Sequence, residues 1–332
     1  MDFNLFKEIL SFDSTSGKER DLALFLEKRL KTHRNKVQRF EVGDGTLNLL
    51  FSWGEPKLYF CTHIDTVPPY IPPVFEGELI KGRGSCDAKG QLFSMFTACL
   101  KLEEEGLDNF ALLLLSGEET GSFGAKAYTR DCPGGELVIV GEPTDNYMAS
   151  AAKGTRAFEV CIKGKSCHSG YPEQGVSSIR RFVDFMMMVE TADFPDDPEQ
   201  GRTTFNIGKL KSDNPQNILS PETTFRIYFR TTFASAPLVP AFMQSLQNEY
   251  TLINDLGGDE PMRFKTFEEI PSKTVAFGSD APRLHKFKEK ILCGPGSILT
   301  AHTAHERIEV QEIKKAVEQY IFMAHKKLKE SR

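Results

Sequence analysis

Metal-binding side chains follow an apolar run that is typical of a β-strand. His63 and Asp65 come directly after residues 58–62, and their side chains share one face because strand side chains alternate. A neutral imidazole is a good zinc ligand, and a carboxylate two residues away can hold its second nitrogen in one tautomer. The pair therefore indicates a ligand of a metal site, with an ordinary histidine at a strand end as the alternative.

Carboxylates occur in two further segments. Asp87 lies in the glycine-rich loop 82–90, which lacks both the Gly-Lys-Ser/Thr ending of a phosphate-binding loop and the spacing of a dinucleotide fingerprint. An aspartate held by close-packed glycines suits a bridge between two cations, although such a loop is often only a turn. Glu118 and Glu119 follow the apolar run 111–115. Because adjacent side chains point in different directions, one carboxylate can bind a metal while the other acts as a base. Carboxylates beside a buried strand are costly unless paired or metal-bound, and a solvated acidic loop is the alternative.

Two later segments complete a set of motifs. Glu142 follows an apolar run within Gly-Glu-Pro-Thr, and His302, His305 and Glu306 lie together near the C-terminus. In order, the chain contains His-x-Asp-x-Val-Pro, Gly-Arg-Gly-x-x-Asp-x-Lys-Gly, Glu-Glu, Gly-Glu-Pro-Thr and His-x-x-x-Glu. In order and separation these motifs resemble the dinuclear zinc aminoacylases and exopeptidases, which include acetylornithine deacetylase, succinyl-diaminopimelate desuccinylase and carboxypeptidase G. The resemblance covers nearly the whole chain.

This resemblance implies two divalent metal ions, zinc with cobalt or manganese also possible, and five ligands: His63, Asp87, Glu119, Glu142 and His302. Asp87 corresponds to the bridge between the metals. One metal would take His63 and Glu142, and the other would take Glu119 and His302. His305 stays the alternative to His302.

The same resemblance gives catalytic roles to two acidic residues. Glu118 corresponds to the general base that takes a proton from water and then delivers it. Asp65 corresponds to the residue that orients His63. A cis peptide between Asp87 and Ala88 is also implied.

The stretch between the ligand motifs supplies further candidates. His168, in Gly-Lys-Ser-Cys-His-Ser-Gly-Tyr-Pro, resembles a lid histidine that donates to the oxyanion formed when water attacks an amide. Arg230 resembles an arginine that grips a substrate carboxylate through its planar fork, with Arg226 as the competitor. Three more residues resemble positions near the substrate: Asn217, Gly278 and Ser279.

The elements that must position these residues change character after Gly154. Before it, short apolar runs alternate with helical patterns, which predicts an α/β layered domain with a mixed, largely parallel sheet. The next stretch gives a strand, a helix, two strands and a helix over 237–250, the order of a small α+β two-layer sandwich. The sequence therefore predicts a zinc-exopeptidase-like catalytic domain of residues 1–153 and 268–332, with an inserted lid or dimerisation domain of residues 154–267.

Composition excludes several classes of protein. The 332 residues carry 41 Lys and Arg against 46 Asp and Glu, a net charge of −5, so no nucleic-acid-binding surface is expected. The longest aliphatic run, 111–115, is far shorter than the ~20 residues that span a bilayer, so no membrane association is expected. The N-terminus shows no secretory-signal pattern. Seven cysteines at irregular spacing, without a Cys-x-x-Cys pair, favour a reducing cytoplasm over a disulfide framework.

These inferences predict a metal-dependent amidohydrolase that removes an N-acyl group from an amino acid. Gly-Pro-Gly-Ser-Ile, Ala-His-Thr and Glu-Arg-Ile are most similar to acetylornithine deacetylase-like members of arginine or lysine biosynthesis. The alternatives are a zinc di- or tripeptidase, a desuccinylase and, more remotely, a non-catalytic protein that binds an amino-acid derivative. The resemblance and the apolar helical run 179–189 also predict a homodimer in which lid closure completes the site.

Overall fold

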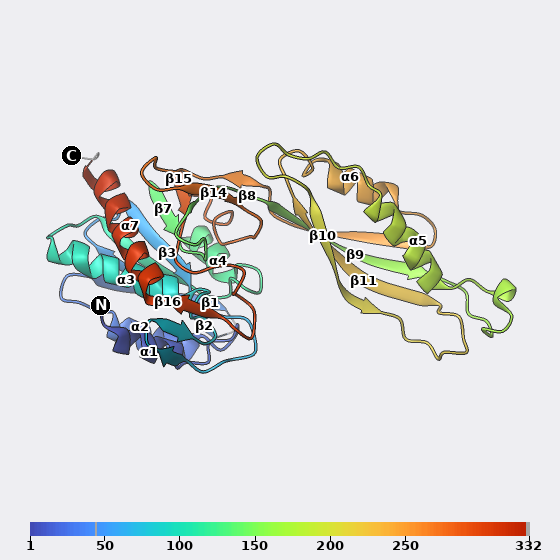
Figure 1. Ribbon diagram of the computed structural model, residues 1–332, viewed down its shortest axis with the longest axis horizontal. Helices are drawn as coiled ribbons and strands as arrows, with labels where there is room; N and C mark the ends of the chain where they lie inside the picture. Colours follow the sequence, from blue (N-terminus) through green and yellow to red (C-terminus); the bar gives the residue numbers. More distant parts are fainter. Residues whose placement is uncertain (44, 330–332) are drawn as a thin grey trace. The chain divides into compact units, whose positions relative to one another are not determined.

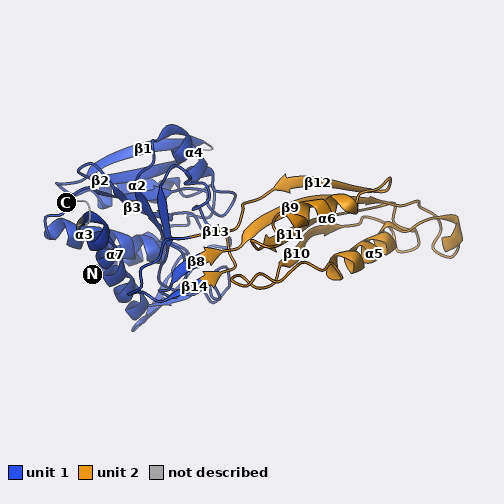
Figure 2. Ribbon diagram, turned by 90° about the horizontal axis from the view of Figure 1, so that it is seen from above, with its two compact units in different colours: residues 1–150, 264–273, 279–332 blue, residues 151–263, 274–278 orange. Residues whose placement is uncertain are grey.

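The computed structural model describes residues 1–43 and 45–329, which form two compact units (Figure 2). The first comprises residues 1–150, 264–273 and 279–332, and the second comprises residues 151–263 and 274–278. Residues 330–332, the end of the predicted catalytic domain, lie outside the described residues. Residues 151–153 and 274–278, which the sequence places in the catalytic domain, group with the second unit, and residues 264–267, which it places in the inserted domain, group with the first. One reason is that the Lys153 amide donates to the Val275 carbonyl at 3.0 Å.

A six-stranded sheet forms the centre of the first unit (Figure 1). In the order β1-β2-β6-β3-β7-β15, the strands from β6 to β15 run parallel, whereas β1 and β2 are antiparallel. Parallel strands covered on both faces need continuous apolar side chains, and β3, β6 and β7 are buried throughout. The predicted mixed, largely parallel sheet is therefore confirmed. Its strands are Lys36–Gly43 (β1), Thr46–Trp53 (β2), Leu58–His63 (β3), Phe110–Leu115 (β6), Leu137–Val140 (β7) and Glu289–Leu292 (β15).

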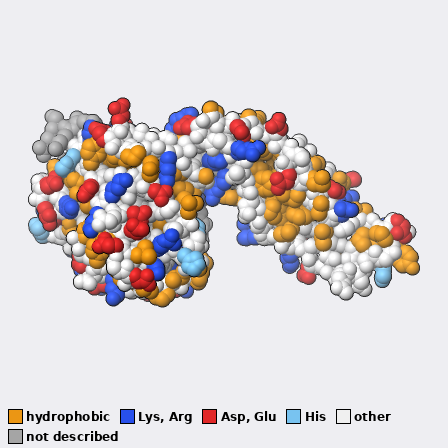
Figure 3. Space-filling view, viewed as in Figure 1, with side chains coloured by type: hydrophobic (Ala, Val, Ile, Leu, Met, Phe, Trp, Pro, Cys, Tyr) orange, Lys and Arg blue, Asp and Glu red, His pale blue; other side chains and the backbone are white. Residues whose placement is uncertain are grey.

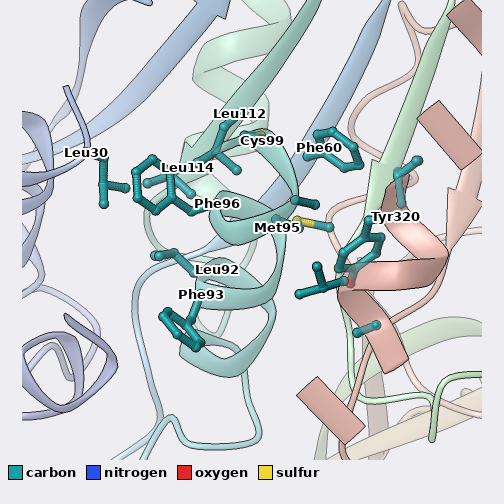
Figure 4. Packing of buried hydrophobic residues seen from close by; sticks show 14 of the residues in the cluster. Leu30, Phe60, Leu92, Phe93, Met95, Phe96, Cys99, Leu112, Leu114 and Tyr320 are labelled. Atoms are coloured by element: carbon teal, nitrogen blue, oxygen red, sulfur yellow. The ribbon is translucent and has the colours of Figure 1, made fainter. Parts of the chain in front are cut away.

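Helices share one hydrophobic core with this sheet. Figure 4 shows Leu92 and Met95 of α3 within the core, and Tyr320 of α7 beside Phe60 of β3. The last two rings meet edge to face with centroids 5.8 Å apart, and the Tyr320 hydroxyl donates to the Cys293 carbonyl at 2.9 Å. The helices are Phe3–Leu10 (α1), Arg20–Arg29 (α2), Lys89–Glu104 (α3), Phe123–Asp131 (α4) and Val310–Lys329 (α7). A small sheet adds Val74–Glu76 (β4), Leu79–Lys81 (β5) and Arg307–Glu309 (β16).

The second unit is a two-layer α+β structure. Its antiparallel sheet has the order β10-β11-β9-β12, and two helices pack on one face. Burial alternates along β9 and β11 because only that face meets the helices, through side chains such as Phe158, Phe225 and Phe229. The strands and helices are Gly154–Lys163 (β9), Thr204–Lys211 (β10), Glu222–Thr231 (β11), Thr251–Gly257 (β12), Ser178–Glu190 (α5) and Leu238–Ser245 (α6).

The remaining elements are short. They are Met148–Ala152 (β8), Met262–Arg263 (β13), Ser272–Val275 (β14) and the 3₁₀ helix Pro172–Gln174. The helix predicted over 237–250 ends at Ser245, because the side chain of Asn248 accepts the amides of Tyr250 and Thr251 and turns the chain into β12. Among the described helices, none is long and apolar enough to cross a membrane.

Candidate metal centre

Three neighbouring parallel strands deliver most of the candidate ligands. His63 is the last residue of β3, Glu118 and Glu119 lie in the turn after β6, and Glu142 is two residues beyond β7. Strands β6, β3 and β7 are adjacent in the sheet, so these side chains emerge at one edge. The carboxyl ends of parallel strands are where open α/β sheets bind their ligands.

Asp87 lies between two histidines. Its Oδ1 is 3.1 Å from His63 Nε2, and its Oδ2 is 3.2 Å from His302 Nε2. His302 Nε2 is also 3.0 Å from Glu119 Oε1. Potential ligand atoms lie within 4.8 Å of one another in three groups among the described residues. One joins His63, Glu118 and Glu119. The other two join His63, Asp87 and Glu142, and Asp87, Glu119 and His302. The structure thus brings the five candidates together, and Asp87 belongs to both of the last two groups.

Charge and burial conflict in this cluster. Burial raises the pKa of Glu118 and of Glu142 well above the usual value. Burial also acts to raise the pKa of Asp87, but hydrogen bonds with His302 and His63 hold it below the usual value. Hydrogen bonds to Asp87 and Glu119 raise the pKa of His302 to about 10. Buried carboxylates need compensating positive charge, and imidazole with carboxylate is a zinc-binding donor set. These residues therefore fit two divalent cations.

Asp65 organises the turn that carries the two glutamates. It is fully buried, and its carboxylate accepts the backbone amides of Glu118 at 3.1 Å and Glu119 at 3.2 Å. The Ser16 hydroxyl donates to it at 2.8 Å. His63 Nδ1 lies 3.0 Å from the backbone carbonyl of Asp65 and 3.5 Å from its carboxylate. Asp65 therefore contacts the imidazole and also ties the glutamate turn to β3.

Glu306 holds the loop that carries Asp87. Its Oε1 accepts the amides of Cys86 at 3.1 Å and Asp87 at 3.0 Å, and its Oε2 accepts from Arg83 Nη1 at 2.5 Å. Arg83 and Glu306 are each only 2% exposed. The peptide after Asp87 is cis, as the sequence resemblance implies.

The two late histidines differ in their surroundings. His302 has a φ of 61°, a left-handed conformation that is rare for residues other than glycine. The side chain of His305 belongs to none of the potential ligand groups found among the described residues, and its backbone amide donates to the Thr303 hydroxyl at 3.1 Å. The geometry therefore favours His302 over His305 as the late ligand.

A further buried carboxylate, Asp280, was missed by the sequence reasoning. It is 2% exposed, and its Oδ1 has no hydrogen-bond partner in the described part of the chain. Burial raises the pKa of Asp280 to about 6, against a hydrogen bond from Ser122, and its charge helps raise the pKa of Glu118. The only signal in the sequence is Gly-Ser-Asp-Ala-Pro, in which Gly278 and Ser279 are the predicted site residues.

His168 and Asn217 lie together in the second unit. The Ser169 amide donates to the Asn217 carbonyl at 2.8 Å, and the backbones of His168 and Ile218 pair in an isolated antiparallel β-bridge. The Gly170 amide donates to His168 Nδ1 at 3.1 Å. These contacts order the histidine loop from within its own unit.

Arg230 lies at the other end of the same sheet. Arg230 pairs in register with Thr155 on β9, whereas the loop of His168 follows Lys163 at the far end of that strand. The eight steps from 155 to 163, at ~3.3 Å each, separate the two ends by about 26 Å. Gly278 adjoins Arg230, because a Cβ built on it would lie 3.8 Å from Arg230 Nη1.

Comparison with known proteins identifies a family, related sequences and structures of the same fold. The family model described as Peptidase family M20/M25/M40 matches residues 59–326. A peptidase M20 domain-containing protein of Schizosaccharomyces pombe is 30% identical over 333 residues, covering 93% of this chain and 80% of that protein. A probable carboxypeptidase of Emericella nidulans is 30% identical over 371 residues, covering 96% and 87%. The structure of a tripeptidase from Staphylococcus aureus has the same fold, with a TM-score of 0.83 and 20% identity, covering 96% and 95%.

Proposed function

The chain belongs to peptidase family M20/M25/M40, whose members hydrolyse amide bonds, and we propose that it is a dinuclear metal-dependent exopeptidase of short peptides. The position of Asp87 in two ligand groups at once is the observation that carries the proposal. The relatives named as a probable carboxypeptidase and a tripeptidase support a peptide substrate. The peptidase alternative from the sequence is therefore preferred to removal of an acyl group from ornithine.

Two divalent cations would occupy this cluster, zinc with cobalt or manganese as alternatives. His63 and Glu142 would hold one, Glu119 and His302 would hold the other, and Asp87 would join them. When bound, such ions would lower the pKa of water and polarise the scissile carbonyl. The potential ligand groups contain histidine, aspartate and glutamate but no cysteine. This set suits metals that accept nitrogen and oxygen donors.

Glu118 takes the proton of the attacking water and passes it to the leaving amine. A carboxylate positioned beside the candidate ligand Glu119 can take a proton from water and give it to the amine. Asp65 fixes the position of this group by accepting its backbone amide at 3.1 Å. Asp65 also accepts the neighbouring amide of Glu119, so the backbone of both Glu118 and Glu119 is held in place.

Arg230 binds the terminal carboxylate of the peptide. Its competitor Arg226 pairs with Glu159 at 3.2 Å and so already has a carboxylate partner. The Arg230 guanidinium lies over the Tyr228 ring, 4.9 Å from its centroid, and a guanidinium can grip a carboxylate through two parallel hydrogen bonds. Gly278 beside it lets a substrate approach the backbone, and Ser279 follows in the same segment.

We expect a homodimer, because one second unit cannot bring both of its candidate groups to one metal centre. The loops of His168 and Asn217 lie at the end of the sheet opposite to Arg230, and the strand between the two ends is about 26 Å long, so a second protomer would supply the histidine as oxyanion donor. Hydrophobic side chains gather on a face of the second unit (Figure 3). On α5, Ile179, Val183 and Met187 form an exposed stripe with 43%, 41% and 62% of their surface accessible, and this stripe is the proposed contact.

Hydrolysis assays on the zinc- or cobalt-loaded protein test the proposal. The substrates are a dipeptide and tripeptide panel, the same peptides with a blocked amino terminus, N-acetylornithine and N-succinyl-diaminopimelate. We expect hydrolysis of peptides, with kcat/KM at least about tenfold above that for N-acetylornithine. Hydrolysis of N-acetylornithine or the succinyl compound alone would overturn the peptide proposal in favour of a deacylase.

The deacetylase interpretation gains no support from the relatives and stays a prediction that the same panel tests. A place in arginine biosynthesis depends on it and stays open with it. A cytoplasmic location also stays a prediction. Binding of peptides without hydrolysis of any substrate, in protein with both metals bound, would favour a non-catalytic protein.

A further inference from the structure

Two large apolar side chains are exposed beside the metal centre. In the described part of the first unit, the exposed large hydrophobic residues are Met1, Val74, Phe123, Tyr147 and Leu299. Phe123 is 52% exposed and follows the candidate ligand Glu119 by four residues. Leu299 is 84% exposed and precedes the candidate ligand His302 by three. The two ligand candidates meet, because Glu119 Oε1 lies 3.0 Å from His302 Nε2, so Phe123 and Leu299 each lie a few residues along the chain from one contact.

The ring of Phe123 is held in place by the glutamate turn. Its backbone amide donates to the Gly117 carbonyl at 3.2 Å. A Cβ built on Gly117, which has a φ of 68°, would lie 3.3–3.8 Å from three atoms of Phe123, and one built on Gly121 would lie 3.9 Å from its ring tip. The ring therefore packs against the turn, Lys126 Nζ lies over it at 5.5 Å from its centroid, and half of the residue's surface stays open to solvent.

Leu299 occupies an ordered loop. The Thr300 and Ala301 amides donate to the Ser297 carbonyl at 3.0 and 3.3 Å, and the Thr303 hydroxyl donates to the Thr300 carbonyl at 2.7 Å. The backbone is thus fixed, yet the leucine side chain contacts almost nothing. Exposing apolar surface in this way is unfavourable, and a bound apolar group would relieve it.

We propose that Phe123 and Leu299 form an apolar subsite on the Glu119–His302 side of the centre, which selects peptides with a large apolar side chain. This inference rests on the proposed exopeptidase function and adds the substrate class. The ligand candidates themselves are charged or imidazole groups, so they do not distinguish a leucine from an alanine. Phe123 and Leu299 supply that distinction, because an apolar side chain removed from water between them gains free energy that a methyl group does not.

Steady-state kinetics on matched peptides test the subsite. The peptides carry Ala, Leu, Phe, Asp or Lys at one position, and each position is varied in turn. We expect the parent enzyme to prefer Leu or Phe to Ala at one position by at least about tenfold in kcat/KM. Phe123→Ser and Leu299→Ser should each reduce that ratio several-fold, whereas Phe123→Leu and Leu299→Met should keep most of it. Val74→Ser is the control, since Val74 is 48% exposed but adjoins no candidate ligand.

The outcomes separate the subsite from the proposed function. A parent enzyme that cleaves all peptides alike, or serine variants that keep the apolar preference, would overturn the subsite and leave the peptidase intact. Serine variants that reduce kcat/KM equally for every peptide would show that these residues act in folding or in closure of the lid, and not in side-chain selection. Calorimetric titration with the same peptides provides the second measurement. If the parent hydrolyses nothing yet binds the leucine peptides more tightly than the serine variants do, the peptidase proposal fails and the subsite stands.

Discussion

Replacing Glu306 tests whether its buried ion pair with Arg83 stabilises the loop that carries Asp87. Glu306→Gln keeps the size of the side chain and an oxygen for the amides of Cys86 and Asp87, but it leaves Arg83 without its carboxylate. Arg83 is 2% exposed, so water cannot replace the lost partner. Removing one member of a buried pair typically costs about 3–5 kcal/mol, and we expect Glu306→Gln to lower the unfolding free energy of the first unit by that amount.

Two companion variants show how this cost arises. Glu306→Ala also removes the acceptor of two backbone amides, at about 1–3 kcal/mol for each buried group left unpaired, so it should be worse than Glu306→Gln. Burial raises the pKa of Glu306, which means that the ionised carboxylate is held at a cost. Removing both charges in Arg83→Met with Glu306→Gln should therefore recover part of the lost stability.

Urea unfolding followed by tryptophan fluorescence is the assay. The chain has a single tryptophan, Trp53, which is buried in β2 and stacked on Phe110, so its signal reports the first unit alone. Metal content is measured on the same samples, since the Asp87 loop should bind metal less tightly once its amides lose their acceptor. Glu76→Gln is the control, because Glu76 pairs with Lys81 at an exposed site and should change stability by less than about 1 kcal/mol. An equal, small effect of Glu306→Gln and Glu76→Gln would refute the reasoning.

Other predictions concern the centre and the second unit. Glu118→Gln should lower kcat by about 10²–10⁴ with metal content unchanged, and loss of metal would make Glu118 a ligand instead of the base. His302→Ala should lose metal while His305→Ala keeps it, and the reverse result by metal analysis would exchange their roles. Because the pKa of His302 is about 10 without metal, the imidazole is protonated at pH 7 and must lose that proton to bind. Metal binding should then release protons and tighten as pH rises, which calorimetry in buffers of different ionisation enthalpy measures; a heat independent of buffer would contradict it. His168→Ala should lower kcat by about 10²–10³, whereas Arg230→Ala should mainly raise KM, and steady-state kinetics that show the opposite split would exchange the two roles. If mixing inactive His168→Ala and Glu118→Gln subunits restores no activity, the histidine does not act across a dimer.

Much of the first unit could be predicted from the sequence because its signals are local. The runs around Phe60 and Leu113 are continuously apolar, as strands buried on both faces must be, and each ends in a polar ligand-type residue. Parallel strands bring their carboxyl ends to one edge, so the order of the motifs already places His63 near Glu142. The order of a strand, a helix, two strands and a helix likewise indicates the two-layer α+β structure of the second unit.

Contacts between distant segments could not be predicted from the sequence, because no regular residue spacing connects such segments. Asp280 reads as one residue of a glycine loop, and only the folded chain buries its carboxylate near Glu118. The pairing of Arg83 with Glu306 joins residues 223 positions apart.

The sequence by itself determined which side chains have the chemistry for a metal centre, because ligand type and strand periodicity are properties of short segments. The tertiary structure decided which of them meet. It places Asp87 between His63 and His302, and it puts the loop of His168 and Arg230 at opposite ends of one sheet, although both belong to one inserted segment. Strand pairing and register set which residues lie close together and which lie far apart. Both depend on the packing of the whole unit.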